Sequence, residues 1–275
     1  MITSSATNIS EDNGLRSQFV WHLINDQNNF ASECAGQNIP RVLIQFWNDG
    51  ESIPLDVQEC IESWRPLEGY GFKHFLFNDI TANDFIKNYF DSRYLNAFHR
   101  CLHPAMRSDY FRLCYLLKNG GFYVDADDVY KNISIEGLFS DDKMKIHPLC
   151  YDISTGSMVR AVDFILNNEY HPDRIYYVNN DPIISPPDHP LIQLALERST
   201  QILLSSDGNI KDVQSTTGPG NLTASLVRYT IELESINKGL DCRFLDNWDN
   251  ISISQWPLEY RKDKRNWRIW DGSNI

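Results

Sequence analysis

The sequence of 275 residues has no long hydrophobic run, and no stretch approaches the roughly 20 apolar residues that a membrane helix needs. Its beginning, residues 1–8, lacks both the basic part and the apolar part of a signal peptide. These two absences predict a cytoplasmic protein with no membrane span. A location in the Golgi lumen would be expected only if an anchor had been removed from the sequence.

Basic charge is also scarce, because 25 Lys and Arg residues are set against 37 Asp and Glu residues, which leaves a formal net charge of −12. A nucleic-acid binder shows a basic face, so we expect no nucleic-acid partner. The six cysteines are scattered and form no C-x-x-C pair, which argues against a cysteine metal cluster. We therefore expect free thiols in a reducing compartment.

Glycine and acidic residues are concentrated at residues 120–128, where the sequence is Gly-Gly-Phe-Tyr-Val-Asp-Ala-Asp-Asp. The glycines permit a sharp turn, and the aromatic and β-branched residues at 122–124 predict a short strand. Because side chains alternate along a strand, Asp125 and Asp127 are expected to leave it on the same side. Such closely spaced carboxylates repel one another unless a cation lies between them. Hard oxygen ligands suit Mg²⁺ or Mn²⁺, so the stretch predicts a metal-bound phosphate or nucleotide site, with a solvated acidic turn as the plainer alternative.

A helix is predicted directly upstream, over residues 104–119, because proline suits the first helical position and glycine the position just past the end. Its apolar residues recur at helical spacing and form one core stripe: Met106, Tyr110, Leu113 and Leu117. Asp109 and Arg112 are three residues apart and share a neighbouring face. They form either an exposed ion pair of little energetic weight or part of the mouth of the predicted site.

The first half of the chain alternates between strand and helix patterns, which predicts an α/β fold with a parallel sheet. The expected elements are strands at 41–47 and 72–77 and helices at 57–64, 82–102 and 104–119. In such a sheet the ligand crevice lies at the carboxyl ends of the strands. Trp47, the Asn78-Asp79 turn and residues 125–127 all follow strands, so we expect them to meet in one crevice.

The second half of the sequence carries weaker signals. Strands are expected at 145–151 and 175–178, and helices at 190–204 and 221–236. Between them, residues 179–185 form either a turn favoured by Asn, Asp and Pro or part of a ligand site.

Two stretches resemble a known family. The pattern S-D-x-x-R at 108–112, followed by G-G-x-Y-x-D-x-D at 120–127, resembles the D-x-D sugar-binding region of glycosyltransferase family 32, and the large bacterial glucosylating toxins carry a similar pattern. Residues 39–47 are similar to the family's opening strand, I-P-K-x-I-H-Q-x-W, although Ile44 stands where the family usually has histidine.

The resemblance implies a GT-A-like fold, which is a Rossmann-like α/β nucleotide-sugar-binding fold with a mixed, mainly parallel sheet flanked by helices. It implies a nucleotide-sugar donor, with a UDP-sugar favoured over GDP-mannose, and Mn²⁺ or Mg²⁺ as the cofactor. Asp127 would be the direct metal ligand. Asp125 would bind the metal through water or hold the ribose.

The resemblance also implies roles around the donor. Asp109 and Arg112 would contact hydroxyls of the donor sugar, and Trp47 would stack on the base, with Gln45 among the donor-binding residues. Asn180 matches an asparagine that reaches the donor sugar. The family retains the anomeric configuration, so no general base is required, and the departing phosphate would take the acceptor proton.

The last stretch, residues 256–275, is locally basic and aromatic in an acidic protein. In the toxin relatives a C-terminal loop closes over the donor and brings a tryptophan to the diphosphate. We favour Trp270 over Trp267 for that position, because the residues after Trp270 are polar. The alternative is a segment whose tryptophans pack on the core.

We expect a loosely ordered or helical arm at residues 1–38, followed by a single GT-A-like domain at 39–275. Within the domain, residues 39–130 would bind the nucleotide sugar and the metal, residues 131–255 the acceptor, and residues 256–275 would form the tail.

The sequence therefore predicts a metal-dependent, retaining glycosyltransferase that acts on a glycan or a lipid-linked saccharide. A toxin-like enzyme that glycosylates protein is one alternative. A phosphate-transferring enzyme is a weaker one, because no P-loop accompanies the carboxylates. A catalytically silent sugar-binding module is the third, and it is suggested by the missing histidine.

Overall fold

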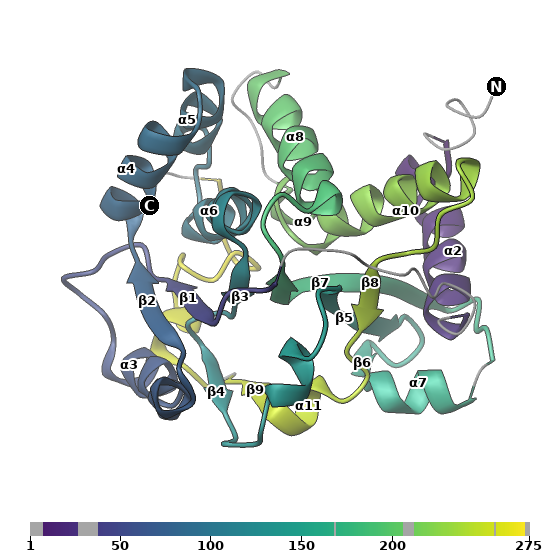
Figure 1. The fold of residues 1–275 in the computed structure, drawn as a ribbon, viewed down its shortest axis with the longest axis horizontal. Helices are drawn as coiled ribbons and strands as arrows, with labels where there is room; N and C mark the ends of the chain where they lie inside the picture. The colour runs from purple at the N-terminus through teal and green to yellow at the C-terminus, as the bar shows by residue number, and fades with distance from the viewer. Residues whose placement is uncertain (1–7, 27–37, 168, 206–211, 256, 273–275) are drawn as a thin grey trace.

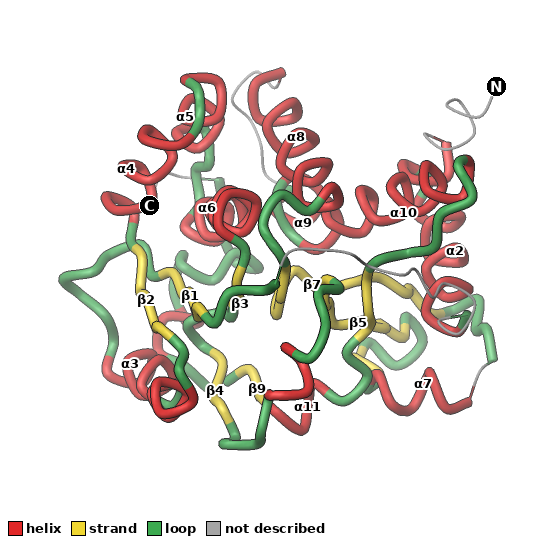
Figure 2. Tube along the Cα trace, viewed as in Figure 1, coloured by secondary structure: helices red, strands yellow, loops and turns green. Residues whose placement is uncertain are grey.

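The computed structural model of the protein describes residues 8–26, 38–167, 169–205, 212–255 and 257–272. A seven-stranded sheet runs in the order β2, β1, β3, β7, β5, β6, and β8 pairs with β5 (Figures 1 and 2). Its strands are β1 (Val42–Phe46), β2 (Lys73–Phe77), β3 (Gly121–Tyr123), β5 (Met144–Asp152), β6 (Ser157–Val159), β7 (Arg174–Ser185) and β8 (Cys242–Phe244). A separate two-stranded sheet pairs β4 (Asp128–Tyr130) with β9 (Ser252–Ser254).

Most strands of the large sheet point the same way. Strand β1 runs parallel to β2 and β3, and β5 runs parallel to β8. Because β7 is antiparallel to both β3 and β5, and β6 is antiparallel to β5, only β6 and β7 oppose the other five strands. The predicted α/β architecture with a mixed, mainly parallel sheet flanked by helices is confirmed. The carboxyl ends of β1 and β3 consequently lie at the same edge.

Helices cover both faces of the sheet, with α6, α8 and α10 above it in the view of Figure 1 and α3 and α11 below. The helices are α2 (Asn13–Asn25), α3 (Leu55–Glu62), α4 (Asp79–Tyr89), α5 (Ser92–His99), α6 (Pro104–Asn119), α7 (Ala161–Asn167), α8 (Pro190–Ser205), α9 (Val213–Thr216), α10 (Pro219–Ser235) and α11 (Trp248–Ile251), and the 3₁₀ turns are η2 (Arg65–Tyr70), η3 (Glu136–Phe139) and η4 (Glu259–Lys262).

The two faces have separate hydrophobic cores. Ile44 of β1 packs in a large cluster with α2, α6, α8 and α10. Its neighbour Leu43 points to the other face and packs with Trp64 and Trp248. Adjacent residues of a strand must face opposite ways, so a central strand covered on both sides is apolar at consecutive positions. This explains why Ile44 stands where the related family usually has histidine: the position is fully buried in apolar surroundings.

Two predictions of local structure are wrong. The helix expected at 82–102 is two helices, because Phe90 leaves the helical conformation and Asp91 then caps α5 by accepting a hydrogen bond from the backbone N–H of Arg93 at 2.8 Å. The turn considered for 179–185 is instead the second half of β7, which pairs with both β3 and β5.

The predicted N-terminal arm is part of the packed body over its described residues. Helix α2 begins after the N-cap Asp12, and its buried residues Val20, Leu23 and Ile24 join the large core cluster. Residues 8–26 are therefore largely helical, which is one of the two alternatives expected for this arm. The rest of the predicted arm, residues 1–7 and 27–37, lies outside the described residues.

Gly120 fixes the turn that leads from α6 into the acidic stretch. Its φ of 64° and ψ of −168° are readily adopted by glycine alone, and a Cβ would lie 2.6 Å from the backbone nitrogen of Pro187.

We expect Gly120→Ala to lower the free energy of unfolding by about 2–5 kcal/mol, through backbone strain and overpacking. Urea unfolding measures this. The matched control is Gly137→Ala, because a Cβ on Gly137 meets no atom within 4 Å, and equal stability of the two variants would contradict the prediction.

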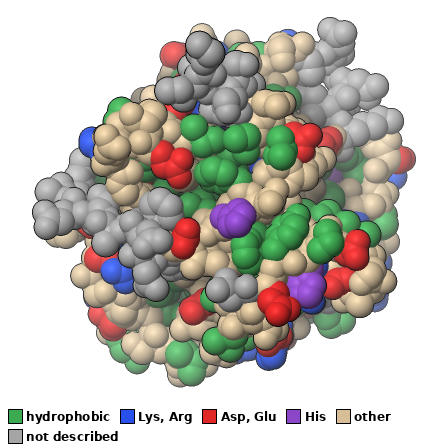
Figure 3. Space-filling model, turned by 90° about the vertical axis from the view of Figure 1, so that its right-hand side faces the viewer, with side chains coloured by type: hydrophobic (Ala, Val, Ile, Leu, Met, Phe, Trp, Pro, Cys, Tyr) green, Lys and Arg blue, Asp and Glu red, His purple; other side chains and the backbone are tan. Residues whose placement is uncertain are grey.

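The described residues include no helix that is long and apolar enough to cross a membrane. Figure 3 shows the side of the molecule that lies on the right in Figure 1. Hydrophobic and acidic side chains are prominent there, and the basic ones are few and scattered. This face shows no basic patch among its described residues, in keeping with the net charge of −12.

Candidate active site

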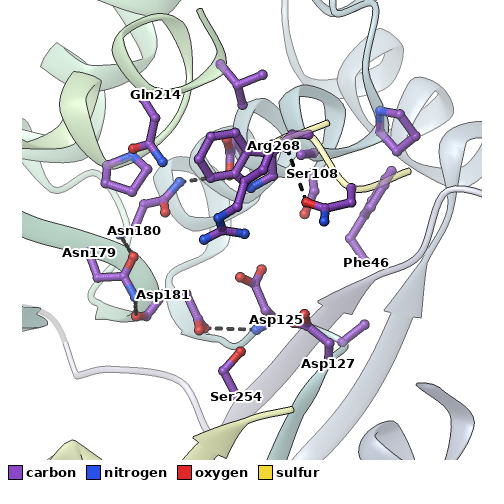
Figure 4. Close-up of a pocket in the computed structure, with 18 of the residues that line it drawn as sticks. Phe46, Ser108, Asp125, Asp127, Asn179, Asn180, Asp181, Gln214, Ser254 and Arg268 are labelled. Carbon is purple, nitrogen blue, oxygen red and sulfur yellow. Dashed lines mark hydrogen bonds between the residues drawn. The ribbon is translucent and has the colours of Figure 1, made fainter. Parts of the chain in front are cut away.

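The carboxyl ends of β1 and β3 open into a cavity of about 380 Å³. Its walls come from the end of β1, the first half of α6, residues 125–127, β7, the region of α9 and α10, and the tail that follows β9 (Figure 4). Small-molecule sites have volumes of about 300–1,000 Å³, and in α/β folds they lie outside the carboxyl ends of the strands. Both size and place fit a ligand site.

Helix α6 carries Asp109 and Arg112 to the cavity. The helix begins at Pro104, and the N-cap His103 accepts a hydrogen bond from the backbone N–H of Ala105 at 3.0 Å. Another face of α6 enters the large core, so the direction of the two charged side chains is fixed by packing. The alternative of an exposed ion pair is wrong, because Asp109 is 6% exposed and Arg112 is 2% exposed.

Arg112 joins three parts of the site. Its Nη2 lies 2.9 Å from Asp109 Oδ1 and 2.8 Å from Asp125 Oδ1, and its Nη1 donates to the carbonyl oxygen of Asn180 at 2.5 Å. The guanidinium also lies 4.0 Å from the centre of the Tyr123 ring, which adds a cation–π contact. Arg112 thus holds α6, the acidic stretch and β7 together.

Burial and charge act on the ionisable groups of this network in opposite directions. Burial raises the pKa of Asp109 to about 6, and Arg112 limits the rise. Burial alone would lower the pKa of Arg112, but the carboxylates of Asp125 and Asp109 and the hydroxyl of Tyr123 outweigh it, and the pKa rises. Arg112 therefore stays charged, whereas Asp109 keeps its charge only because the guanidinium is beside it.

Asp109 has further partners that fix its orientation. Its Oδ1 accepts a hydrogen bond from Asn180 Nδ2 at 2.8 Å, and its Oδ2 accepts one from Thr217 Oγ1 at 3.1 Å. Each carboxylate oxygen has two acceptor positions, so Oδ2 keeps one for a ligand hydroxyl. The side chain is rigidly placed and still able to bind.

Asp125 is the most accessible carboxylate of the acidic stretch, with 35% of its side chain exposed. It points into the cavity between Asp127 and Asp181 in Figure 4. Its backbone is held from two sides, because its N–H donates to Asp181 Oδ1 at 2.9 Å and its carbonyl accepts from Gln45 Nε2 at 3.1 Å. The carboxylate is thus presented to a ligand by a fixed backbone.

Two more aspartates are almost fully buried: Asp181, which lines the cavity, and Asp128, which lies behind the wall. Burial raises the pKa of Asp128 to about 8, and the charges of Asp127 and Asp125 add to the rise. Burial and the nearby Asp128 raise the pKa of Asp181 well above its usual range. Burial and neighbouring negative charge therefore favour the neutral form of both carboxyl groups while no cation is bound.

Asp127 is covered by the tail. Its Oδ2 accepts a hydrogen bond from the Tyr260 hydroxyl at 2.6 Å and pairs with Arg261 Nη2. Burial and Asp125 raise the pKa of Asp127, and Arg261 opposes the rise. The tail reaches this point because β9 pairs with β4 directly after the acidic stretch, which places Ser254 opposite Asp128.

The donor set fits a hard divalent cation. Asp125, Asp127, Asp128 and Ser254 supply only oxygen, and Asp128 Oδ1 is buried with no hydrogen-bond partner among the described residues. These carboxylates do not form a closed three-ligand group of their own. Mg²⁺ and related ions commonly use one or two carboxylates together with waters and substrate phosphates, so an open arrangement is what a metal–nucleotide site requires.

A different group of possible metal ligands lies outside the cavity. Among the described residues, only His189, Asp241 and Cys242 bring three His, Cys, Asp or Glu ligand atoms within 4.8 Å of one another. His189 Nδ1 accepts a hydrogen bond from the backbone N–H of Leu191 at 3.2 Å, which places the ring proton on Nε2, facing Asp241 at 3.5 Å. Tyr229 also donates to Asp241 at 2.9 Å. Hydrogen bonds hold Asp241 and the Nδ1 side of the His189 ring, whereas His189 Nε2 is buried with no hydrogen-bond partner among the described residues.

The predicted site residues do not all reach the cavity. It is lined by most of them, namely Trp47, Asp109, Arg112, Asp125, Asp127 and Asn180. Gln45 lies outside the wall, where its Nε2 donates to the backbone carbonyl of Asp125 and its Oε1 accepts a hydrogen bond from His74 Nε2 at 2.7 Å. Trp270 packs against His103 with ring centres 5.0 Å apart, and Trp267 lines the cavity in its place. Of the two tryptophans, Trp267 is thus the one that lines the cavity, and the choice of Trp270 as the tryptophan that reaches the diphosphate stays a prediction.

Sequence reasoning missed other residues at the cavity. Asp181 adds a fourth carboxylate, and Tyr260 and Arg261 cover Asp127. Asp181 lies one position after Asn180, so the same motif could have indicated it. The basic composition of the tail pointed to Arg261 only in general terms, because nothing in the spacing shows which arginine turns inward.

The comparisons with known proteins concern the region that builds this site. Residues 54–145 match the family described as glycosyltransferase sugar-binding region containing DXD motif. An uncharacterized glycosyltransferase of Acanthamoeba polyphaga mimivirus is 33% identical over 92 residues, which is 33% of this chain and 36% of that protein. The chain thus matches about a third of the length of this relative.

A solved structure, PaToxG glycosyltransferase, is 14% identical and has a TM-score of 0.48, with 96% of this chain and 94% of that chain covered. A likeness at this level carries no conclusion about function.

The region that matches the family, residues 54–145, contains Asp109, Arg112, Asp125 and Asp127, all of which line the cavity. This part of the chain is therefore similar to a glycosyltransferase sugar-binding region containing a DXD motif, which supports a transferase.

Proposed function

We propose that the protein is a metal-dependent glycosyltransferase that transfers a sugar from a nucleotide-sugar donor to a saccharide acceptor. One observation carries the proposal: the carboxylates of the DXD motif and the Asp109–Arg112 pair of the same family region line a single cavity at the strand ends. Asp127 would be the direct ligand of Mn²⁺ or Mg²⁺, and Asp125 would bind the metal through water or hold the ribose. When bound, the cation supplies positive charge for the departing diphosphate.

The residues of the chain would place the donor sugar. The free acceptor position on Asp109 Oδ2 can receive a hydroxyl of the sugar, and Arg112 keeps that carboxylate ionised at neutral pH. Asn180 is held by both residues, so it would share in the same contact. A UDP-sugar is the preferred donor and GDP-mannose the alternative.

We infer retention of the anomeric configuration from the resemblance to family 32. Asp109 and Asp125 are both engaged by Arg112, and Asp127 is engaged by Arg261, so each of these cavity carboxylates already has a cationic partner. None of the three is an evident nucleophile or general base. A mechanism in which the departing phosphate takes the acceptor proton needs neither.

The acceptor would enter from the side of β5, β6 and β7. There Leu149, Met158 and Tyr177 line the cavity, and Tyr177 donates to the sulfur of Met158 at 3.7 Å. Met158 is 48% exposed, so this wall is open to solvent. An uncharged wall of aromatic and apolar groups fits the C–H face of a sugar ring, which supports a glycan or a lipid-linked saccharide as the acceptor.

The direct test uses a panel of UDP- and GDP-sugars, scored for nucleotide release with and without Mn²⁺. We expect release from one class of donor, and only with the metal. Hydrolysis of a donor without acceptor would exclude a catalytically silent module. If no donor is bound or hydrolysed under any condition, the proposed function is wrong.

Trp47 tests the placement of the base. Stacking on a nucleobase is worth about 1–3 kcal/mol, so Trp47→Ala should raise the dissociation constant for the donor about 5–150-fold, and Trp47→Phe should recover much of it. Trp47 is 8% exposed and has the Tyr260 ring edge-on at 5.2 Å, so it also packs in a core. Calorimetric titration with UDP, alongside thermal melting, separates the two roles. Unchanged UDP affinity with a lower melting temperature would make Trp47 a core residue only.

A further inference from the structure

One ion pair lies directly on the predicted metal ligand. Arg261 lies in η4 of the tail, and its Nη2 forms an ion pair with Asp127 Oδ2. The same oxygen accepts a hydrogen bond from the Tyr260 hydroxyl at 2.6 Å. Arg261 Nη2 also lies 3.3 Å from Ser254 Oγ. The side chains of Arg261 and Asp127 are 11% and 12% exposed, so solvent ions screen this pair only weakly.

Arg261 and a divalent cation compete for Asp127. A carboxylate oxygen has two acceptor positions, and Tyr260 and Arg261 occupy both positions of Oδ2. A cation on the same carboxylate would also lie next to the guanidinium, and two positive charges repel strongly where water is largely excluded. Coordination of a cation through Asp127 Oδ2 therefore requires the guanidinium to turn away.

The cavity offers the guanidinium a second partner once a donor is present. Arg261, Arg265 and Arg268 line the cavity, and all three come from the tail. Burial lowers the pKa of Arg268, and the charge of Arg261 lowers it further, which shows that the two guanidinium groups repel each other. A diphosphate would relieve that repulsion, and arginine is the side chain best shaped to bind phosphate with two hydrogen bonds.

We propose that Arg261 exchanges partners when the donor binds: it pairs with Asp127 while the site holds no metal, and with the diphosphate of the nucleotide sugar once the metal is on Asp127. This inference rests on the proposed function, because it takes Asp127 as the metal ligand. Its consequence is that Arg261 weakens the binding of metal alone and strengthens the binding of the diphosphate. The site thereby favours the metal–nucleotide complex over either part.

The exchange predicts opposite effects of one substitution. In R261Q, the dissociation constant for Mn²⁺ without nucleotide should fall about tenfold, because its competitor for Asp127 is gone. The dissociation constant for UDP at saturating Mn²⁺ should rise about tenfold, because one charge-assisted phosphate contact is lost. The first is measured from the electron paramagnetic resonance signal of free Mn²⁺ and the second by calorimetric titration with UDP.

Two variants control the experiment. R160Q removes an exposed arginine that pairs with Asp163 at 2.8 Å and does not line the cavity, so both dissociation constants should stay within about twofold of wild type. R261K keeps the charge but not the paired donors of arginine. It should leave Mn²⁺ affinity near the wild-type value while UDP binding still weakens severalfold, and it carries the test if R261Q does not fold.

The outcomes distinguish this inference from the proposed function. Opposite shifts in R261Q, with R160Q unchanged, support the exchange. If R261Q moves both affinities in the same direction, or moves neither, Arg261 does not exchange partners, although the enzyme can still be a glycosyltransferase. If the wild-type protein binds neither Mn²⁺ nor UDP, it is the proposed function that fails.

Discussion

Asp127→Asn is expected to abolish nearly all sugar transfer while the protein stays folded. Loss of the direct metal ligand removes positive charge from the departing diphosphate, an effect worth several kcal/mol, so the rate should fall about 10³-fold or more. Chelation of the metal by EDTA should have the same effect on wild type. Initial rates of nucleotide release with the preferred donor measure both.

The fold should tolerate this substitution because of the contacts around Asp127. Asparagine keeps an oxygen that can accept from Tyr260 and Arg261, the two side chains that meet Asp127 Oδ2. Burial already raises the pKa of Asp127, so replacing the charge with a neutral amide removes a desolvation cost at the same time. The melting temperature should therefore change little.

The matched control is Asp163→Asn, which alters an exposed aspartate of α7 that pairs with Arg160 on the surface. It should retain full activity. Full activity in Asp127→Asn, or in wild type with EDTA, would remove the basis for assigning the metal to Asp127. If the variant is both inactive and unfolded, Asp127 is required for the stability of the fold, and the loss of activity says nothing about the metal.

Much of the site could be predicted because its residues lie at sequence positions with a clear geometric meaning. The helix expected at 104–119 is present with the same bounds as α6, because proline and glycine mark its two ends. The strand expected at 122–124 is β3, at Gly121–Tyr123, and the aspartates follow it directly. Parallel strands end at one edge of the sheet, so Trp47 and the acidic stretch had to be neighbours.

What could not be predicted depends on contacts between segments far apart in the chain. Asp127 meets Arg261 across 134 positions, through a strand pairing of only three residues between β4 and β9. Neither such a short strand nor the inward turn of one arginine leaves a periodic signal. The position of Trp270 could not be predicted for the same reason, because the packing of its ring on His103 is a tertiary contact.

Arg112→Met should cost the protein about 3–5 kcal/mol of unfolding free energy. Methionine has a similar length and no charge, so it leaves Asp109 and Asp125 without their shared cation and the Asn180 carbonyl without its donor. Breaking a buried pair in this way is far more costly than losing an exposed one, because the remaining carboxylate is left desolvated and unpaired. Urea unfolding at pH 7.5, near neutrality, with a linear extrapolation to zero denaturant, measures the loss.

The matched control is Arg41→Met, which removes the exposed partner of Glu136, with side chains 38% and 49% exposed. That pair should be worth no more than about 1 kcal/mol. If Arg112→Met also lowers the free energy of unfolding by no more than about 1 kcal/mol, the buried network contributes no more to stability than a surface pair.

The loss in Arg112→Met should also depend on pH, with a sign that identifies its cause. Burial already raises the pKa of Asp109 to about 6 with the guanidinium present, and removing that charge raises the pKa further. A carboxyl group whose pKa is higher in the folded state destabilises the fold as the pH rises above the unfolded value of about 3.9. The variant should therefore recover part of its stability between pH 7.5 and pH 5, where Asp109 takes up a proton and the buried charge disappears. A loss that is the same at both pH values would trace the effect to packing and not to an unpaired carboxylate.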